Sequence, residues 1–440
     1  MNIFKIATYS FDTRWFSAAM ATILIAAISR LHGFEVVVPY FFIAGLAIFF
    51  SVLVFRITQV ILFYKDSLHE HFNPEKNLYS FSIVGAISLA GVYLSKIFHL
   101  YTAAYICWYV AVSFWLIFSL SSFSILFLYQ ESEDRKIEDI LHGGWFFAIA
   151  GTQFTAFLGV TVAEHAVQNA AGIQLFSFAQ WSVGASLYLV FVVFIILRMV
   201  FYPFSSTTAI SPYWMNIGAA ALTALTGTAL YHHVHAAGGP FTDFLPFLKG
   251  FSLFFWSIGL WWLPLLFVLS MRKQACSTDG LTFTVGYWEV VFALGLYAKS
   301  TIQINALFQE QYLFIASLCF SVACIVLWCF SSIFTLVHLI KSAVWVPVND
   351  LTINYVVPYS FKLRGRIFFV KKVVNEWVDQ TIQDAWKKHY SIMINNNILC
   401  HISYDKGTKK WYLDAVEEQG GSDNHQERQV QGASRTSIKT

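Results

Sequence analysis

Charge is scarce in this sequence. Only 12% of the 440 residues are Asp, Glu, Lys or Arg, against about 25% in typical soluble proteins, while 57% are hydrophobic. A soluble fold of this size needs a charged exterior around its core, so lipid must cover much of this chain. The net charge of +3 is too small to indicate a nucleic-acid partner.

The sequence also lacks the motifs of several enzyme and metal-binding classes. Its six cysteines include no C-x-x-C pair, which is the spacing typical of zinc and redox sites. No P-loop, Gly-x-Ser-x-Gly or His-Glu-x-x-His motif occurs. ATP-driven transport and hydrolysis therefore have no support, and we predict no catalytic residues, no metal and no cofactor.

Long apolar runs are what the sequence has instead. A bilayer core of about 30 Å requires about 20 apolar residues per helix. We therefore predict a cytoplasmic N-terminus over residues 1–13 and an all-α integral membrane domain over residues 14–341. Its ten expected spans are 14–31, 38–63, 79–98, 101–128, 144–163, 175–201, 212–232, 246–271, 282–306 and 311–341.

Positive charges predict the orientation of these spans, because Lys and Arg are enriched in cytoplasmic loops. Most of them flank the start of span one and the loops after even-numbered spans, which predicts a multi-pass protein of the cell membrane, inner or plasma, with both termini cytoplasmic. The charges on that side are Lys5, Arg14, Lys65, Lys76, Arg135, Lys136, Arg198, Arg272 and Lys273.

Side-chain size alternates from span to span. Odd spans are rich in small and hydroxyl residues, as at 17–22, 85–91 and 150–153, whereas even spans are bulky, as at 115–118 and 191–194. Small residues let membrane helices approach closely, and large apolar side chains suit lipid. The alternation predicts five helical hairpins with the odd helices inside, around a polar-tolerant path. A solid bundle, in which small residues only mark packed interfaces, is the alternative.

Span nine carries ionisable residues at membrane depth. At 100° per residue, Glu289, Phe292, Leu296, Lys299 and Gln303 fall on one side of this helix. Such groups are costly in lipid and usually face a bundle interior or a cavity, which places Phe292 near mid-membrane on the path. Lys299 either attracts anions there or extends to the outer interface, and Glu289 is either interfacial or part of the pore.

Span seven opens with Ser211-Pro212, a helix-start signal, and presents a mildly polar stripe that includes Asn216 and Thr223. Together with the other odd spans it supplies the candidate pore-lining residues, which are small, hydroxyl-bearing or on the inward side of span nine. They are Ser17, Ala21, Gly85, Ser88, Thr152, Thr155, Gly159, Asn216, Thr223, Gly227, Gly295, Leu296, Lys299 and Gln303.

Three motifs in order resemble signatures of the tellurite-resistance/dicarboxylate transporter family, which includes plant slow-type anion channels, malate permeases and sulfite exporters. They are Ser-Pro-Tyr-Trp-Met-Asn-Ile-Gly-Ala at 211–219, Trp-Glu-Val-Val-Phe-Ala-Leu-Gly-Leu-Tyr at 288–297, and the segment 145–153. The resemblance implies ten helices as five hairpins around a central pore, commonly in a homotrimer. It also implies that Phe292 is the gate. Members often have proline after this phenylalanine, whereas this chain has Ala293, which leaves the gate geometry open.

Two features lie outside this scheme. Histidine clusters bind metals and titrate near neutral pH, so His232, His233 and His235 leave open a membrane enzyme, although a solvated outer loop is the default interpretation. Beyond the spans we expect a small cytoplasmic α+β appendage over residues 342–416. It would have a helix at 374–385 and a hairpin formed by 398–404 and 410–413, and residues 417–440 would be disordered.

We therefore predict a transporter of small anions, either C4-dicarboxylates or inorganic anions such as tellurite, sulfite or chloride, through a phenylalanine-gated central pore. Its expected partners are the anion, the lipid bilayer and two further copies of the chain, with no nucleic acid. A membrane enzyme that uses the histidine cluster, and a membrane sensor that signals through the cytoplasmic tail, are the alternatives.

Overall fold

The computed structural model describes residues 11–128, 140–166, 168–202, 209–276 and 284–344, followed by six strands between 346 and 418. The chain divides into two compact units, a helical unit that ends at Ile340 and a C-terminal unit that begins at Lys341. The predicted N-terminal segment up to residue 10, the positive charges Arg135 and Lys136, and the tail from residue 419 lie outside the described residues.

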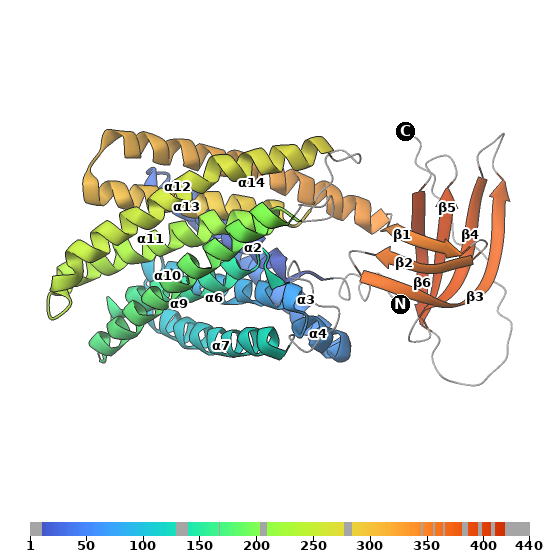
Figure 1. The fold of residues 1–440 in the computed structure, drawn as a ribbon, viewed down its shortest axis with the longest axis horizontal. Helices are drawn as coiled ribbons and strands as arrows, with labels where there is room; N and C mark the ends of the chain where they lie inside the picture. The colour runs from blue at the N-terminus through green and yellow to red at the C-terminus, as the bar shows by residue number, and fades with distance from the viewer. Residues whose placement is uncertain are drawn as a thin grey trace. The chain divides into compact units, whose positions relative to one another are not determined.

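Long helices make up the helical unit (Figure 1). They are α2 (Phe16–Leu31), α3 (Val38–Leu62), α6 (Phe81–Lys96), α7 (Tyr101–Leu128), α9 (Trp145–Ala163), α10 (Ala170–Phe201), α11 (Ser211–Ala237), α12 (Leu245–Cys276), α13 (Tyr287–Phe308) and α14 (Gln311–Val344). Short helices connect them: η1 (Thr13–Trp15), η2 (Glu35–Val37), α4 (Tyr64–His71), α5 (Pro74–Asn77), η3 (Leu78–Ser80) and η5 (Thr242–Phe244).

The ten predicted spans all correspond to helices. The largest differences in their ends are five residues, as where α10 begins at Ala170 instead of 175. Within the described ranges, nine helices are long and apolar enough to cross a membrane. The tenth, α11, is long enough at 27 residues, but its alanine, glycine, threonine and histidine residues make it less apolar.

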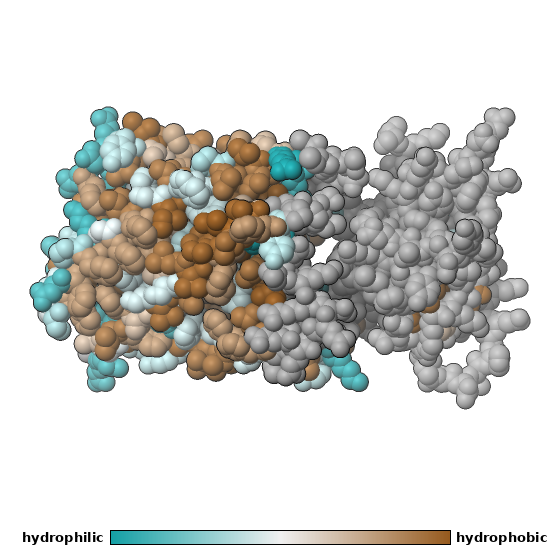
Figure 2. All heavy atoms as spheres, viewed as in Figure 1, coloured by the Kyte–Doolittle hydropathy of each residue, from teal (hydrophilic) through white to brown (hydrophobic). Residues whose placement is uncertain are grey.

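Odd and even helices differ sharply in burial, which confirms the predicted alternation. In the most apolar window of α2, α6, α9 and α13, between 61% and 94% of the residues are buried, against 17% to 39% in the even helices. Every residue of α11 from Pro212 to Thr228 is buried. The even helices expose large apolar side chains, and Figure 2 shows such brown residues over much of the helical unit, with teal residues gathered at its left-hand end. The even helices are therefore the ones that suit lipid.

The five inner helices form a closed ring. Going around it, α2 packs on α6, α6 on α9, α9 on α11, α11 on α13, and α13 returns to α2. Small residues allow this close packing: a Cβ on Gly218 of α11 would lie only 3.4 Å from the Cα of Ala293 on α13. Along the sequence, α3, α7, α10 and α12 each pack on the inner helix that precedes them. A path for ions through this domain would therefore run along the axis of the ring.

Tryptophans of the outer helices bind hydroxyls of the inner ones. The indole Nε1 of Trp115 donates to Thr152 Oγ1 at 2.8 Å, Trp256 donates to Thr301 at 2.9 Å, and Trp328 donates to Thr22 at 3.1 Å. In lipid a polar group without a partner is costly, so each bond satisfies both groups where the two layers meet.

The C-terminal unit is a closed barrel of six antiparallel strands in sequential order. The strands are β1 (Val346–Asn354), β2 (Val357–Leu363), β3 (Arg366–Gln380), β4 (Trp386–Ile394), β5 (Ile398–Asp405) and β6 (Lys410–Glu418). Ile392, Cys400 and Ile402 are buried in it.

The barrel confirms the predicted hairpin and corrects the predicted helix. Tyr404 of β5 pairs with Trp411 of β6, as the hairpin requires. The helix expected at 374–385 is wrong, because its described part belongs to β3, where Trp377 pairs with His389. Strand pairing across the barrel outweighs local helical spacing here, so the described part of this appendage is all β and not α+β.

Candidate functional site

Aromatic and apolar side chains meet where the inner helices enclose their axis. Phe292 of α13 is fully buried and stacks on Phe154 of α9, with ring centroids 5.9 Å apart and planes at 24°. On α6, a Cβ added to Gly85 would lie 3.0 Å from Met20 Sδ of α2 and 3.2 Å from Phe154 Cδ2. The side chains of Phe154, Phe292 and Met20 and the backbone of Gly85 therefore bring four of the five inner helices together around the Phe154–Phe292 stack.

The fifth inner helix reaches α13 one turn further along. Leu296 is fully buried, and its Cδ1 lies 3.7 Å from the position that a Cβ on Gly218 of α11 would take. Phe292 and Leu296 therefore follow one another along the inward side of α13.

Lys299 lies two turns, or about 10 Å, beyond Phe292 on the same helix. Its ammonium lies 5.1 Å from the Tyr93 ring centroid and 5.3 Å from that of Phe157, and it donates to the Tyr93 hydroxyl at 3.3 Å. Because Tyr93 belongs to α6 and Phe157 to α9, the ammonium lies among inner helices. Across the described ranges, no carboxylate lies within 4.0 Å of it.

Further cations surround this end of the ring. Lys96 at the end of α6 forms an ion pair with Glu164, and Arg30 at the end of α2 donates to the Lys96 carbonyl at 3.0 Å. Both cations are close enough to Lys299 to repel it electrostatically. Within this local cluster three groups are positive and one is a carboxylate, so the cluster itself carries excess positive charge that attracts anions.

The opposite mouth of the inner ring, where α13 begins, contains a buried carboxylate. Glu289, one turn before Phe292 on α13, is fully buried, which does not fit an exposed interfacial position. Arg14 Nε lies 3.9 Å from its Oε1. The same guanidinium binds Asp12 through three contacts of 2.6 to 3.1 Å and lies over the Tyr79 ring, 5.3 Å from its centroid.

Several predicted pore-lining residues are buried in the inner helices. Ser17, Ala21, Ser88 and Thr155 have essentially no exposed surface. The Oγ atoms of Ser17 and Ser88 have no hydrogen-bond partner in the part of the chain that the structure describes, whereas Thr155 donates to the Thr152 carbonyl at 2.7 Å. Unpaired hydroxyls inside the ring are groups that a passing ion or water can use.

Other predicted pore-lining residues contact neighbouring helices. Thr152 accepts from Trp115, as described above, and Asn216 accepts from the Tyr188 hydroxyl of α10 at 2.6 Å. Thr223 donates to the carbonyl one turn back along α11. Sequence spacing identified these helices as inner ones but did not separate the side that faces the axis from the sides that face neighbours.

The three remaining glycines of the predicted set also lie at helix contacts. A Cβ on Gly295 would lie 3.2 Å from Leu24 of α2 and from Cys324 of α14. Gly159 packs on Trp108, Gly227 packs on Trp181, and Gln303 is half-buried near the end of α13.

The sequence patterns did not identify four side chains of this site: Met20, Tyr93, Phe154 and Phe157. Phe154 directly follows the small and polar run 150–153, and a bulky ring next to that run was the available signal. A helix buried on all sides has no polar face to orient it, so periodicity alone could not place these rings on the axis.

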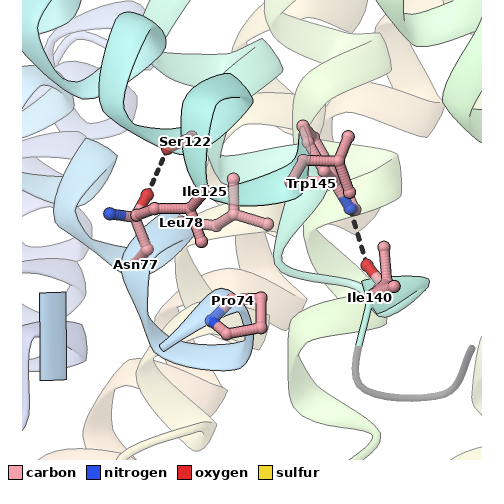
Figure 3. Close-up of a pocket in the computed structure, with 8 residues that line it drawn as sticks. Pro74, Asn77, Leu78, Ser122, Ile125, Ile140 and Trp145 are labelled. Atoms are coloured by element: carbon pink, nitrogen blue, oxygen red, sulfur yellow. Dashed lines mark hydrogen bonds between the residues drawn. The ribbon is translucent and has the colours of Figure 1, made fainter. Parts of the chain in front are cut away.

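Two other features of the helical unit are not sites of this kind. The histidines His232, His233 and His235 lie at the end of α11, and no three His, Cys, Asp or Glu side chains in the described residues are arranged to hold a metal ion. A cavity of about 10 Å³ lies between α5, α7 and the start of α9 (Figure 3), where Trp145 Nε1 donates to the Ile140 carbonyl at 2.8 Å. It has room for about one water molecule.

Comparison with known proteins decides the family. A family model described as voltage-dependent anion channel matches residues 10–336, which include α2 to α13 and most of α14. The chain belongs to the voltage-dependent anion channel family. This membership agrees with the resemblance drawn from the three motifs, and it identifies a multi-pass membrane transporter or channel and not an enzyme.

Individual relatives agree with this assignment. An uncharacterized transporter of Methanocaldococcus jannaschii is 24% identical over 300 residues, covering 66% of this chain and 84% of the relative. A second uncharacterized transporter of that organism is 24% identical over 309 residues, 68% of this chain and 85% of the relative. An uncharacterized membrane protein of Mycobacterium tuberculosis is 34% identical over 104 residues, 23% of this chain and 51% of the relative.

Proposed function

We propose that the protein moves small anions along the axis of its inner ring and that Phe292, stacked on Phe154, is the gate. The observation that carries this proposal is the stack itself, two rings with centroids 5.9 Å apart and planes at 24°, where α9 and α13 meet inside the ring. An aromatic ring in a narrow apolar passage blocks an ion by its size and by excluding water. A rotamer change of Phe292 would open the passage.

The charge around the passage supports an anion as the cargo. Lys299 lies two turns from the gate without a carboxylate within 4.0 Å in the described ranges, and Arg30 adds positive charge near it, whereas Lys96 is paired with Glu164. Aromatic rings and one tyrosine hydroxyl hold the Lys299 ammonium weakly, so it can bind an anion and release it. We include chloride, nitrate, sulfite, tellurite and C4-dicarboxylates as candidate substrates.

The gate is tested by the variant Phe292→Ala in the purified full-length chain, reconstituted into vesicles. Removal of the ring leaves space on the axis, so we expect anion efflux to rise roughly tenfold or more, which corresponds to about 1.4 kcal/mol of barrier. Efflux of chloride, nitrate, sulfite and malate would be followed separately, and the anion with the largest rise identifies the preferred substrate class.

Phe255→Ala is the matched control for this experiment. Phe255 is also fully buried, but it lies on the outer helix α12 against Tyr188 and Phe251. Its loss also leaves a void, with a similar cost in stability, and should not raise efflux. Equal efflux from the wild type and Phe292→Ala, or an equal rise in Phe255→Ala, would show that Phe292 is not the gate.

The proposal also includes a homotrimer in the cell membrane with both termini in the cytoplasm. Its support is the family resemblance for the trimer and the distribution of Lys and Arg for the orientation. Crosslinking of the purified protein that stops at dimers would contradict the trimer, and a C-terminal reporter that is active outside the cell would contradict the orientation.

A further inference from the structure

Glu289 is a charged group in an unusual position for an anion pathway. It lies on the same side of α13 as Phe292 and Lys299, one turn from the first and about 15 Å along the helix from the second. An anion that passes the gate must therefore pass this carboxylate. Its side chain is fully buried, and neither Oε1 nor Oε2 has a hydrogen bond of good geometry within the described residues, although the Ser211 hydroxyl lies close enough to interact with the carboxylate.

The groups around Glu289 do not neutralise it when it is ionised. Arg14 is the one cation within 4.0 Å among the described residues, at 3.9 Å, and Asp12 already binds that guanidinium through both carboxylate oxygens. Arg14, Asp12 and ionised Glu289 together carry a net charge of −1. A buried charge without full compensation is costly, and uptake of one proton by the carboxylate removes that cost.

The other titratable or polar groups that face this cluster include one cation, Lys76, whose ammonium is paired with the Glu70 carboxylate at 3.4 Å. Tyr79 of η3 lies under the Arg14 guanidinium, and the Ser211 hydroxyl at the start of α11 faces the Glu289 carboxylate. Lys76 acts electrostatically on Asp12 from α5. From α14, Thr335 accepts from the neighbouring Trp288 and carries no charge.

We propose that Glu289 is a proton-binding site inside the anion pathway, through which protons control the passage of anions. With a proton bound, the carboxylate is neutral and the cluster has no net charge, so an anion can pass. Without the proton, the cluster repels anions at the mouth of the ring opposite Lys299. Transport should therefore be faster at acidic pH and slower as the pH rises.

This inference rests on the proposed anion transport, so its test uses a chain with an open gate. Full-length Phe292→Ala protein in vesicles is compared with the double variant Phe292→Ala/Glu289→Gln, with chloride and nitrate as the probes. Between about pH 5 and pH 8 we expect efflux from the first to fall by about tenfold, as one added charge near the path would cause. The amide introduced by Glu289→Gln cannot ionise, so efflux from the double variant should stay high over this whole pH range.

Two conservative variants separate the charge from structural effects. Glu289→Asp keeps a titratable group and should keep the pH dependence, which also covers the case that Glu289→Gln does not fold. Asp12→Asn keeps the side-chain oxygen that accepts from the Arg14 backbone amide but frees the guanidinium to neutralise Glu289. It should therefore reduce the fall in efflux at high pH.

The outcomes distinguish this inference from the proposed function. No efflux from any variant at any pH, with either probe, would count against anion transport itself. Efflux from the Phe292→Ala chain that does not change with pH, or an identical pH profile in Glu289→Gln, would overturn the role of Glu289 alone. An unchanged profile in Asp12→Asn would overturn the sharing of Arg14 on which the charge balance depends.

Discussion

Lys299 shows how one side chain can bias a pathway without binding its cargo tightly. Its neighbours are two aromatic rings and one hydroxyl, which stabilise a cation through the ring quadrupoles and leave its charge available. A carboxylate in the same place would form an ion pair and cancel that charge. The nearby glutamate Glu164 is instead paired with Lys96.

Replacement of Lys299 by glutamine should therefore slow anion efflux in the Phe292→Ala background. One charge at about 4 Å contributes about 1 kcal/mol even when water screens it fully, so we expect a loss of about fivefold. Lys299→Arg should keep most of the flux, because it keeps the charge. Vesicle efflux at low and high ionic strength is the measurement, and the loss should shrink with salt, because salt screens the interaction.

Lys249→Gln is the control for Lys299. Its ammonium also lies over an aromatic ring, 4.6 Å from the Phe308 centroid, but it belongs to the outer helix α12. If Lys249→Gln slows efflux as much as Lys299→Gln does, the effect comes from the general surface charge and not from a group on the axis.

At the scale of helices, the packing of the ring depends on a few close backbone approaches. Gly143, just before α9, lies against the start of α11: a Cβ there would be 2.5 Å from the Pro212 carbonyl carbon and 2.7 Å from the Tyr213 nitrogen. Both are backbone atoms, which cannot move aside as a flexible side chain can. Glycine is therefore needed here because of space and not because of a special backbone angle.

Gly143→Ala should lower the stability of the helical unit by about 1–3 kcal/mol, the usual cost of overpacking. Thermal unfolding of the detergent-solubilised protein is the measurement. In Gly250→Ala, by contrast, nothing lies within 4 Å of the new Cβ, and a helical alanine should be neutral or stabilising by up to about 1 kcal/mol. Equal unfolding midpoints for the two variants would show that α9 and α11 do not approach each other here as closely as described.

The helices could be predicted from the sequence more completely than the residues of the site could. Spans were visible because lipid demands long apolar runs, and the inner and outer layers were visible because small residues mark close packing. Phe292 was identified by resemblance, whereas its partner Phe154 depends on how α9 is rotated about its own axis. Long-range packing sets that rotation, and no local pattern in a fully buried helix reports it.

The same limit explains the mistake in the C-terminal unit. Val374 and Trp377 have helical spacing, but in the structure β3 pairs with β4 from Val370 to Gln380. Strand propensity depends on cross-strand neighbours, which a single sequence does not show. The hairpin between β5 and β6 was predictable because its turn is local.

At the scale of the whole chain, two compact units raise the question of what the barrel contributes. All residues proposed for the gate and its two charged mouths precede Ile340, within the helical unit. Burial in the barrel raises the pKa of the Cys400 thiol to about 12, so this cysteine should resist alkylation at neutral pH while the barrel is folded. Its reactivity therefore reports whether a full-length sample carries a folded barrel.

Truncation after Val344 tests whether the barrel takes part in transport. Because compact domains commonly fold alone, we expect the truncated Phe292→Ala chain to keep its anion efflux within about twofold of the full-length chain. The comparison is made in the same vesicles, with a full-length sample in which Cys400 is protected from iodoacetamide. A large loss of efflux from a truncated chain that still elutes as a single folded species would assign the barrel a direct part in opening the path, as a sensor that signals through its tail requires. Retained efflux would make the barrel an accessory to a helical unit that transports by itself.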